Sequence, residues 1–156
     1  MKFSTQQEID APIAVVFAML SEFDALEAAL RRRGADVARM DDPVGPGAGL
    51  KWHVRVELAG GMRAVDVEIV AFDPPARMGA ILVSQGVQGD TRLSLVALSA
   101  EKTRVLFEVD LRATTFAARV LLQPLKLGKT SLDQRFEARV AQYLDEMKQR
   151  YDQGEA

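Results

Sequence analysis

The hydrophobic pattern changes its period along the chain and so predicts the elements in order. Residues Lys2–Ile9 alternate between two faces, as the residues of a strand do. After Pro12 the apolar positions recur at helical spacing, and a second, alanine-rich helix is predicted from Asp24 to about Arg33. A short strand is expected around Val37–Met40. The first quarter of the chain is therefore predicted to hold a strand, two helices and a further strand.

The middle of the chain reads as a series of short-linked strands. Residues Asp41–Gly49 contain two prolines and three glycines, which predicts a loop. The alternating runs that follow are Leu50–Leu58, Met62–Phe72, Arg77–Gln85, Thr91–Ser99 and Arg104–Ala113. Their links are too short for the crossover that parallel neighbours require, so an antiparallel meander is predicted.

The last third returns to a helical period. Its apolar stripe comprises Leu125, Leu132, Phe136, Val140, Leu144, Met147 and Tyr151. A helix is predicted from Thr115 to about Tyr151, with Pro124 and Gly128 expected to kink or interrupt it. Because a meander with one apolar face must be covered, the fold is predicted to be α+β, with a curved antiparallel sheet gripping this long helix. We treat residues 1–156 as a single domain.

Strand alternation also predicts which side chains face inward. In the run Leu50–Leu58, Trp52 and Val54 share the inner face, and His53 points outward among charges. The other inner residues expected are Val65, Val67, Ile69, Ala71, Val105, Phe107, Val109 and Leu111. The inner residues named so far belong to the runs Leu50–Leu58, Met62–Phe72 and Arg104–Ala113. All the acidic residues of these three strands fall on the outer face, so no inward carboxylate pair suited to acid–base catalysis is found. His53 is read as a surface histidine.

Two strands resist this assignment because both of their faces are apolar. They contain Ala80–Val83 and Thr91–Ser99, and Arg92 would point inward only if its strand were turned the other way. A partner surface, such as that of a homodimer, is one explanation for the extra apolar face. Scattered surface apolar residues, or packing against the first two helices, are the other.

The amino-acid composition excludes several kinds of catalytic and metal-binding site. The chain has no cysteine and one histidine, which excludes disulfides, thiolate catalysis, cysteine zinc sites and histidine-pair metal sites, so no metal or cofactor is expected. The balance of 20 basic and 22 acidic residues gives a net charge of −2 and disfavours a nucleic-acid partner. The longest uncharged stretch near the N-terminus, Ala11–Leu20, is half the roughly 20 residues that a bilayer span requires, so no stable membrane insertion is expected. We expect a cytoplasmic protein.

A few inward positions suggest a binding surface. Thr5 and Gln7 face inward beside Phe3 and Ile9, so they either pair with each other or line a cavity that holds water or a ligand. Trp52 is read as a core residue in preference to a ligand platform, and its indole N–H requires a partner if it is buried.

Three segments in order resemble the START-like (SRPBCC) superfamily, in its polyketide cyclase/dehydrase and lipid-transport group. EIDAPIAVVFAML is similar to that family's first strand and helix, GAGLKW to the entry of its third strand, and VEIVAFDPPARM to a strand with a Pro-Pro turn. The resemblance covers nearly the whole chain and implies a helix-grip fold, in which the sheet and the C-terminal helix enclose a cavity for apolar ligands. By position it implies a pocket formed by Thr5, Gln7, Trp52, Val54, Val67, Leu95, Phe107, Val109 and Phe136.

Taken together, these features favour the binding or carrying of a small hydrophobic ligand, lipid-like or aromatic and polyketide-like, without catalysis. One alternative is a cyclase or dehydratase acting on a polyketide-like substrate, which would need an inward acid or base. Another is a protein-interaction module whose cavity is filled by side chains.

Overall fold

The computed structural model describes residues 1–41, 47–58 and 61–154. In order, its elements are β1 (Lys2–Ile9), α1 (Ile13–Leu20), α2 (Phe23–Arg32), β2 (Asp36–Asp41), β3 (Lys51–Leu58), β4 (Gly61–Asp73), β5 (Arg77–Ser84), β6 (Val87–Ser99), β7 (Lys102–Ala113), α3 (Phe116–Leu127) and α4 (Lys129–Asp152). The predicted order of strands and helices is confirmed. Most of the predicted loop over 41–49 lies outside the described residues.

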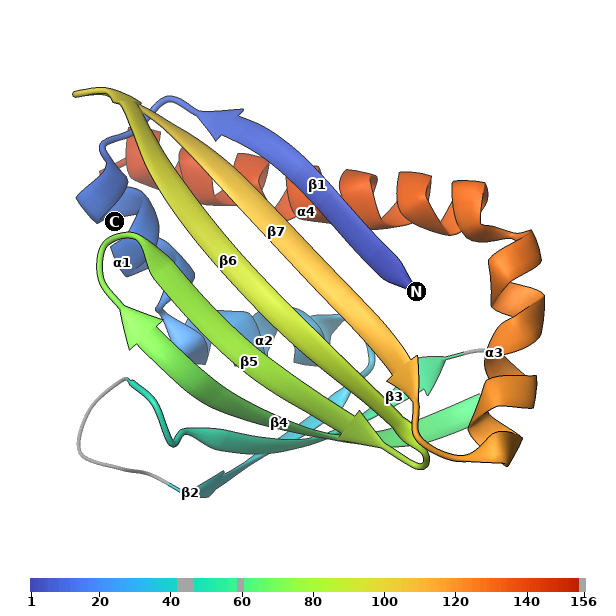
Figure 1. The fold of residues 1–156 in the computed structure, drawn as a ribbon. Helices are drawn as coiled ribbons and strands as arrows, with labels where there is room; N and C mark the ends of the chain where they lie inside the picture. The colour runs from blue at the N-terminus through green and yellow to red at the C-terminus, as the bar shows by residue number, and fades with distance from the viewer. Residues whose placement is uncertain (42–46, 59–60, 155–156) are drawn as a thin grey trace.

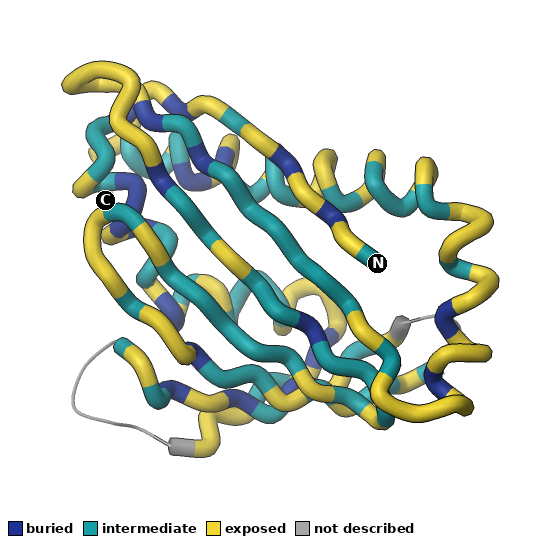
Figure 2. The backbone as a smooth tube through the Cα atoms, in the orientation of Figure 1, coloured by how far each residue is buried: buried dark blue, intermediate teal, exposed yellow. Residues whose placement is uncertain are grey.

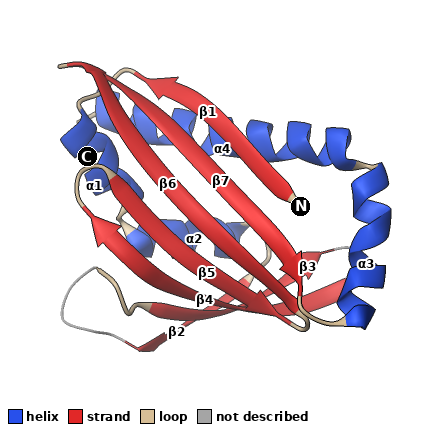
Figure 3. Ribbon diagram, viewed as in Figure 1, coloured by secondary structure: helices blue, strands red, loops and turns tan. Residues whose placement is uncertain are grey.

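The seven strands form one antiparallel sheet in the order β1-β7-β6-β5-β4-β3-β2. Strands β2 to β7 follow one another as the predicted meander, and β1 joins the free edge of β7. Figure 1 shows the sheet curving across the molecule, with α4 behind it and in contact with β1. Figure 3 shows the sheet in front and the helices behind it, with α3 at one end. The predicted helix-grip architecture is confirmed.

The predicted C-terminal helix is interrupted at Gly128, which divides it into α3 and α4. Thr115 caps α3, its hydroxyl accepting a hydrogen bond from the backbone N–H of Ala118 at 3.1 Å. Pro124 stays within α3, and Gly128 separates α3 from α4. None of the described helices is both long and apolar enough to cross a bilayer.

The tight turn between β5 and β6 fixes the start of α3. Ser84 pairs with Val87, so Gln85 and Gly86 form a two-residue hairpin loop in which Gly86 has a φ of +72°. The Gly86 carbonyl accepts a hydrogen bond from the Thr114 N–H at 2.6 Å. A Cβ on Gly86 would lie 2.4 Å from the Thr115 hydroxyl oxygen. Glycine is required here by its backbone conformation and by the close approach of α3.

One predicted inner residue is wrong. Ala71 is exposed, because the pairing of β4 with β5 shifts between Ile69 and Ala71. The bulge reverses the alternation beyond this point, as one extra residue in a strand must. Phe72 therefore packs inside in place of Ala71.

Two clusters of buried side chains form the core. The first lies where α1 and α4 cover the sheet, and the second lies under α2. The first comprises Ile9, Ala11, Val16, Phe17, Met19, Leu95, Val105, Leu144 and Met147. The second comprises Phe23, Ala35, Leu50, Trp52, Val54 and Ile69. Phe72 and Met78 pack against both clusters, and beside them part of the inner face on β5, β6 and β7 is only partly buried.

Candidate functional site

Beside the two core clusters, part of the inner face is apolar but only partly buried. It is formed by adjacent side chains of β5, β6 and β7, which we call the central surface: Leu82, Thr91, Phe107, Val109 and Leu111. Its four apolar residues belong to neither core cluster. Figure 2 shows that many residues along these strands are partly buried. A partly covered apolar surface on the concave side of a sheet is a natural place for an apolar ligand.

Thr91 contributes an unusual polar atom to this surface. Thr91 pairs with Val109 on β7 and with Ala80 on β5, so its neighbours along the sheet are apolar. Among the buried side-chain nitrogen and oxygen atoms of the described residues, only its Oγ1 has no hydrogen-bond partner. An unpaired buried hydroxyl costs about 1–3 kcal/mol. Rotation about χ1 exchanges the hydroxyl and the methyl group of a threonine, so the hydroxyl can turn toward whatever occupies the central surface.

An aromatic group borders the central surface on the β1 side. Phe107 stacks on Phe136 of α4, with ring centroids 5.5 Å apart and planes at 18°. Phe3 of β1 completes the group, its centroid 5.9 Å from that of Phe136. Next to it, the Gln7 amide donates a hydrogen bond to the Thr5 hydroxyl at 2.9 Å. The two inward polar residues of β1 therefore pair with each other.

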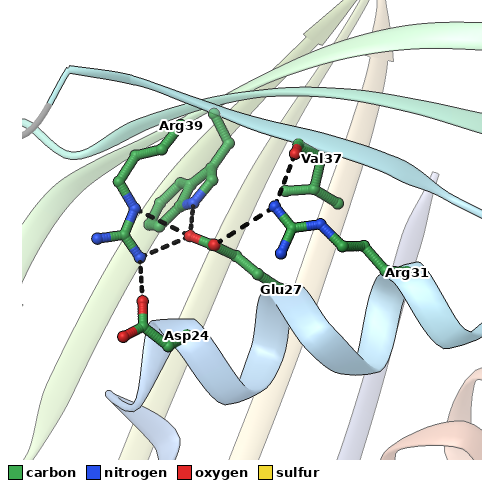
Figure 4. A network of polar contacts seen from close by, with 6 residues as sticks. Asp24, Glu27, Arg31, Val37 and Arg39 are labelled. Atoms are coloured by element: carbon green, nitrogen blue, oxygen red, sulfur yellow. Dashed lines mark hydrogen bonds and ion pairs between the residues drawn. The ribbon is translucent and has the colours of Figure 1, made fainter.

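On the opposite side, a charged network ties α2 to the sheet (Figure 4). The Trp52 indole N–H donates to a Glu27 carboxylate oxygen at 2.8 Å. The Arg39 guanidinium donates to the same oxygen and also to Asp24, and lies over the Trp52 ring, 5.7 Å from its centroid. Arg31 donates to the Val37 carbonyl at 2.9 Å. The network supplies the partner that the indole requires and holds α2 against β2 and β3.

Glu27 is the charged group that sequence reasoning missed. Its side chain is only 12% exposed. Burial raises the pKa of its carboxyl, but the hydrogen bonds from Trp52 and Arg39 and the positive charges of Arg39 and Arg31 outweigh burial and lower that pKa below its ordinary value. Glu27 is therefore ionised near neutral pH and serves as an acceptor. Helical spacing could have indicated that Glu27 points inward. It falls four residues after Phe23 and three before Leu30, on the face of α2 that packs inward.

The nine residues predicted to form a pocket fall into three places. Phe107 and Val109 lie on the central surface, and Thr5, Gln7 and Phe136 border it. Leu95 belongs to the cluster under α1 and α4, while Trp52, Val54 and Val67 pack in the cluster under α2. The structure brings the first five together and adds Leu82, Thr91 and Leu111 to them.

The two strands whose faces the sequence left open have definite orientations. Ala80, Leu82, Leu93 and Leu95 face inward, while Val83 and Val96 are exposed on the outer face. Arg92 is also exposed there, beside Glu108 of β7. Val83 pairs with Gln88 and Val96 lies eight residues further along β6, about 26 Å away at strand spacing. These apolar residues are scattered and do not form one patch.

Outside the central surface, we considered His53, clusters of potential metal ligands and two surface pockets as candidate sites. His53 lies on the outer face as predicted, with its side chain 41% exposed, and hydrogen-bonds the Asp66 carboxylate at 2.7 Å. Within the described ranges, no three or more histidine, aspartate or glutamate side chains gather as a metal site would require. A pocket of about 230 Å³ lies between Gln7–Asp10 and α4, and one of about 380 Å³ lies beside His53, Arg63 and Gln85. Neither contains a residue of the central surface.

The sequence itself matches a known family. A family model described as polyketide cyclase / dehydrase and lipid transport matches residues 1–151. The chain belongs to this family. No curated protein sequence matches it significantly.

Solved structures share the fold of this family member at low sequence identity. The ZhuI aromatase/cyclase from Streptomyces sp. R1128 is 16% identical, with a TM-score of 0.69 over 97% of this chain and 95% of the other. TTHA0849 from Thermus thermophilus is 16% identical, with a TM-score of 0.70 over 94% and 96%. Norcoclaurine synthase from Thalictrum flavum is 9% identical, with a TM-score of 0.62 over 87% and 86%. At these identities the likeness establishes the helix-grip fold alone.

Proposed function

We propose that this protein binds or carries a small hydrophobic ligand on the central surface, without transforming it. The observation that carries the proposal is the combination of partly buried apolar side chains with one buried, unpaired hydroxyl, that of Thr91. An apolar ligand would cover the exposed parts of Leu82, Val109 and Leu111 and gain roughly 25 cal/mol for each Å² that it removes from water. A polar group on the ligand would pair with the Thr91 hydroxyl and fix the ligand's orientation.

The character of the neighbouring side chains supports binding over catalysis. The inner-face positions of β5, β6 and β7 carry only uncharged residues throughout their described lengths. The acid–base chemistry of a cyclase or dehydratase needs a titratable group beside the reacting atoms. Glu27 is a largely buried carboxylate that could be considered as a catalytic acid or base. Its lowered pKa keeps it ionised, and its oxygen already accepts hydrogen bonds from Trp52 and Arg39. The membership of the family supports a hydrophobic ligand and does not choose between carrier and cyclase.

Native mass spectrometry of gently purified protein tests the proposal. We expect a small apolar adduct in the wild type, released and identified on denaturation. Val109→Phe adds bulk to the central surface and should abolish the adduct. Val96→Phe adds the same bulk to the outer face, where Val96 is 54% exposed, and should retain it. An adduct that persists in Val109→Phe at wild-type occupancy would place the ligand elsewhere.

A further inference from the structure

Helix α3 is apolar on two opposite faces. Its packed face carries the buried residues Ala118 and Leu122. On its other face Phe116 is 78% exposed, Val120 51% and Leu127 94%. At about 100° per residue these three side chains fall within about 40° of one another, so they form a single outward stripe. Large apolar side chains are seldom left this exposed when they lie together on one helix face.

The charged residues of α3 itself, Arg119 and Lys126, are all basic. Between Leu111 and Leu132 the sequence contains four basic residues and no acidic one, in a chain whose net charge is −2. Arg112 pairs with Asp90, and Lys129 with Asp133. Arg119 and Lys126, seven residues apart on one flank of the stripe, have no ion pair with any residue that the structure describes. An apolar stripe flanked by unpaired cations complements a layer of anionic headgroups over hydrocarbon.

We propose that α3 docks this protein reversibly on anionic phospholipid membranes. Phe116, Val120 and Leu127 would enter the boundary between headgroups and acyl chains, while Arg119 and Lys126 would contact lipid phosphates. The helix would lie in the plane of the interface and would not cross the bilayer. Its attachment to the fold suits this role, because Gly86 and Thr115 fix the start of α3 and leave the outward stripe uncovered. The proposal does not depend on a ligand at the central surface.

Co-sedimentation of the full chain with vesicles tests this docking. We expect binding to vesicles of phosphatidylcholine mixed with phosphatidylglycerol, and much weaker binding to phosphatidylcholine alone. Arg119→Gln with Lys126→Gln should weaken binding by about fivefold per charge, hence ~30-fold together. Phe116→Ser with Leu127→Ser should weaken it at least about tenfold, because the apolar contact is lost.

Matched variants elsewhere keep the result specific. Val96→Ser with Leu98→Ser removes exposed apolar side chains from the outer face of the sheet, and Arg32→Gln with Arg33→Gln removes exposed charges at the end of α2. Both double variants should bind as the wild type does. Phe116→Trp supplies a second readout, since its emission should shift to the blue on anionic vesicles while Trp52 stays buried.

Three results would overturn the proposal. The first is no binding to either vesicle type, and the second is equal loss of binding in the matched variants. The third is a dimeric mass in solution that Phe116→Ser with Leu127→Ser converts to a monomer, which would assign the stripe to a second copy of the chain. Docking is measured by vesicle sedimentation and ligand binding by the adduct in the native mass spectrum, so failure of one proposal is distinguishable from failure of the other.

Discussion

Replacing Glu27 by alanine tests whether one carboxylate holds α2 against the sheet. The change removes the acceptor of the Trp52 indole N–H, and Trp52 is only 7% exposed. It also removes the anion that accepts two hydrogen bonds from Arg39. The variant should fold, because the apolar cluster under α2 is untouched, but it should be less stable.

The size of the loss follows from the burial of each partner. Leaving the buried indole N–H unpaired costs about 1–3 kcal/mol. The Arg39 side chain is 28% exposed, so water replaces its lost partner and adds at most about 1 kcal/mol. We expect Glu27→Ala to lower the free energy of unfolding by about 3 kcal/mol. Glu27→Gln keeps an acceptor for the indole and should cost about 1 kcal/mol.

Urea unfolding, followed by circular dichroism and by the fluorescence of the single tryptophan, measures both losses. Asp24→Ala is the matched control, since Asp24 is on the same helix and binds the same arginine but is 94% exposed. Its effect should stay within about 0.5 kcal/mol. If Glu27→Ala costs no more than Asp24→Ala, the reasoning from burial is refuted.

Three further predictions concern the turn at α3, the unpaired hydroxyl of Thr91 and the pH dependence of stability through Glu27. Gly86→Ala should lower stability by roughly 2–4 kcal/mol in urea unfolding, because its Cβ would lie 2.4 Å from the Thr115 hydroxyl at a φ of +72°; a neutral result would contradict the proposed contact. Thr91→Val should raise the stability of the ligand-free protein by about 1 kcal/mol, and a loss of stability would mean that the hydroxyl has a partner. Because folding lowers the pKa of Glu27, the stability it contributes is present above the ordinary glutamate pKa near 4.5 and is lost as the pH falls through the folded value. The stability gap between wild type and Glu27→Gln should therefore narrow on acidification, and a constant gap across a pH series of urea unfolding would contradict the lowered pKa.

The regular alternation of several strands made the fold predictable from sequence. In β3 and over most of β7, charged residues alternate with apolar ones, so the inner face was evident at Trp52 and Val109. The helical period and Thr115 located the start of the C-terminal helices, and Gly128 marked their division.

Other features depend on contacts that periodicity does not encode. The bulge after Ile69 reversed the position of Ala71, since one extra residue in a strand leaves no mark in an apolar run. Alternation could not orient β5 or β6, whose two faces are both apolar, so the inward position of Thr91 was missed. The bond between Glu27 and Trp52 joins residues 25 positions apart and becomes visible only when α2 lies over the sheet.

A titration that observes methyl groups by NMR tests the central claim most directly, because it locates the ligand. The probes are a naphthol, which has an aromatic body and one hydroxyl, and decanoate, which has an alkyl chain and a carboxylate. The account predicts saturable shifts of the Leu82, Val109 and Leu111 methyls with at least one probe, and none at Val83 and Val96 on the outer face. Shifts confined to the outer face, or none at either set with both probes, would contradict a binding site on the central surface.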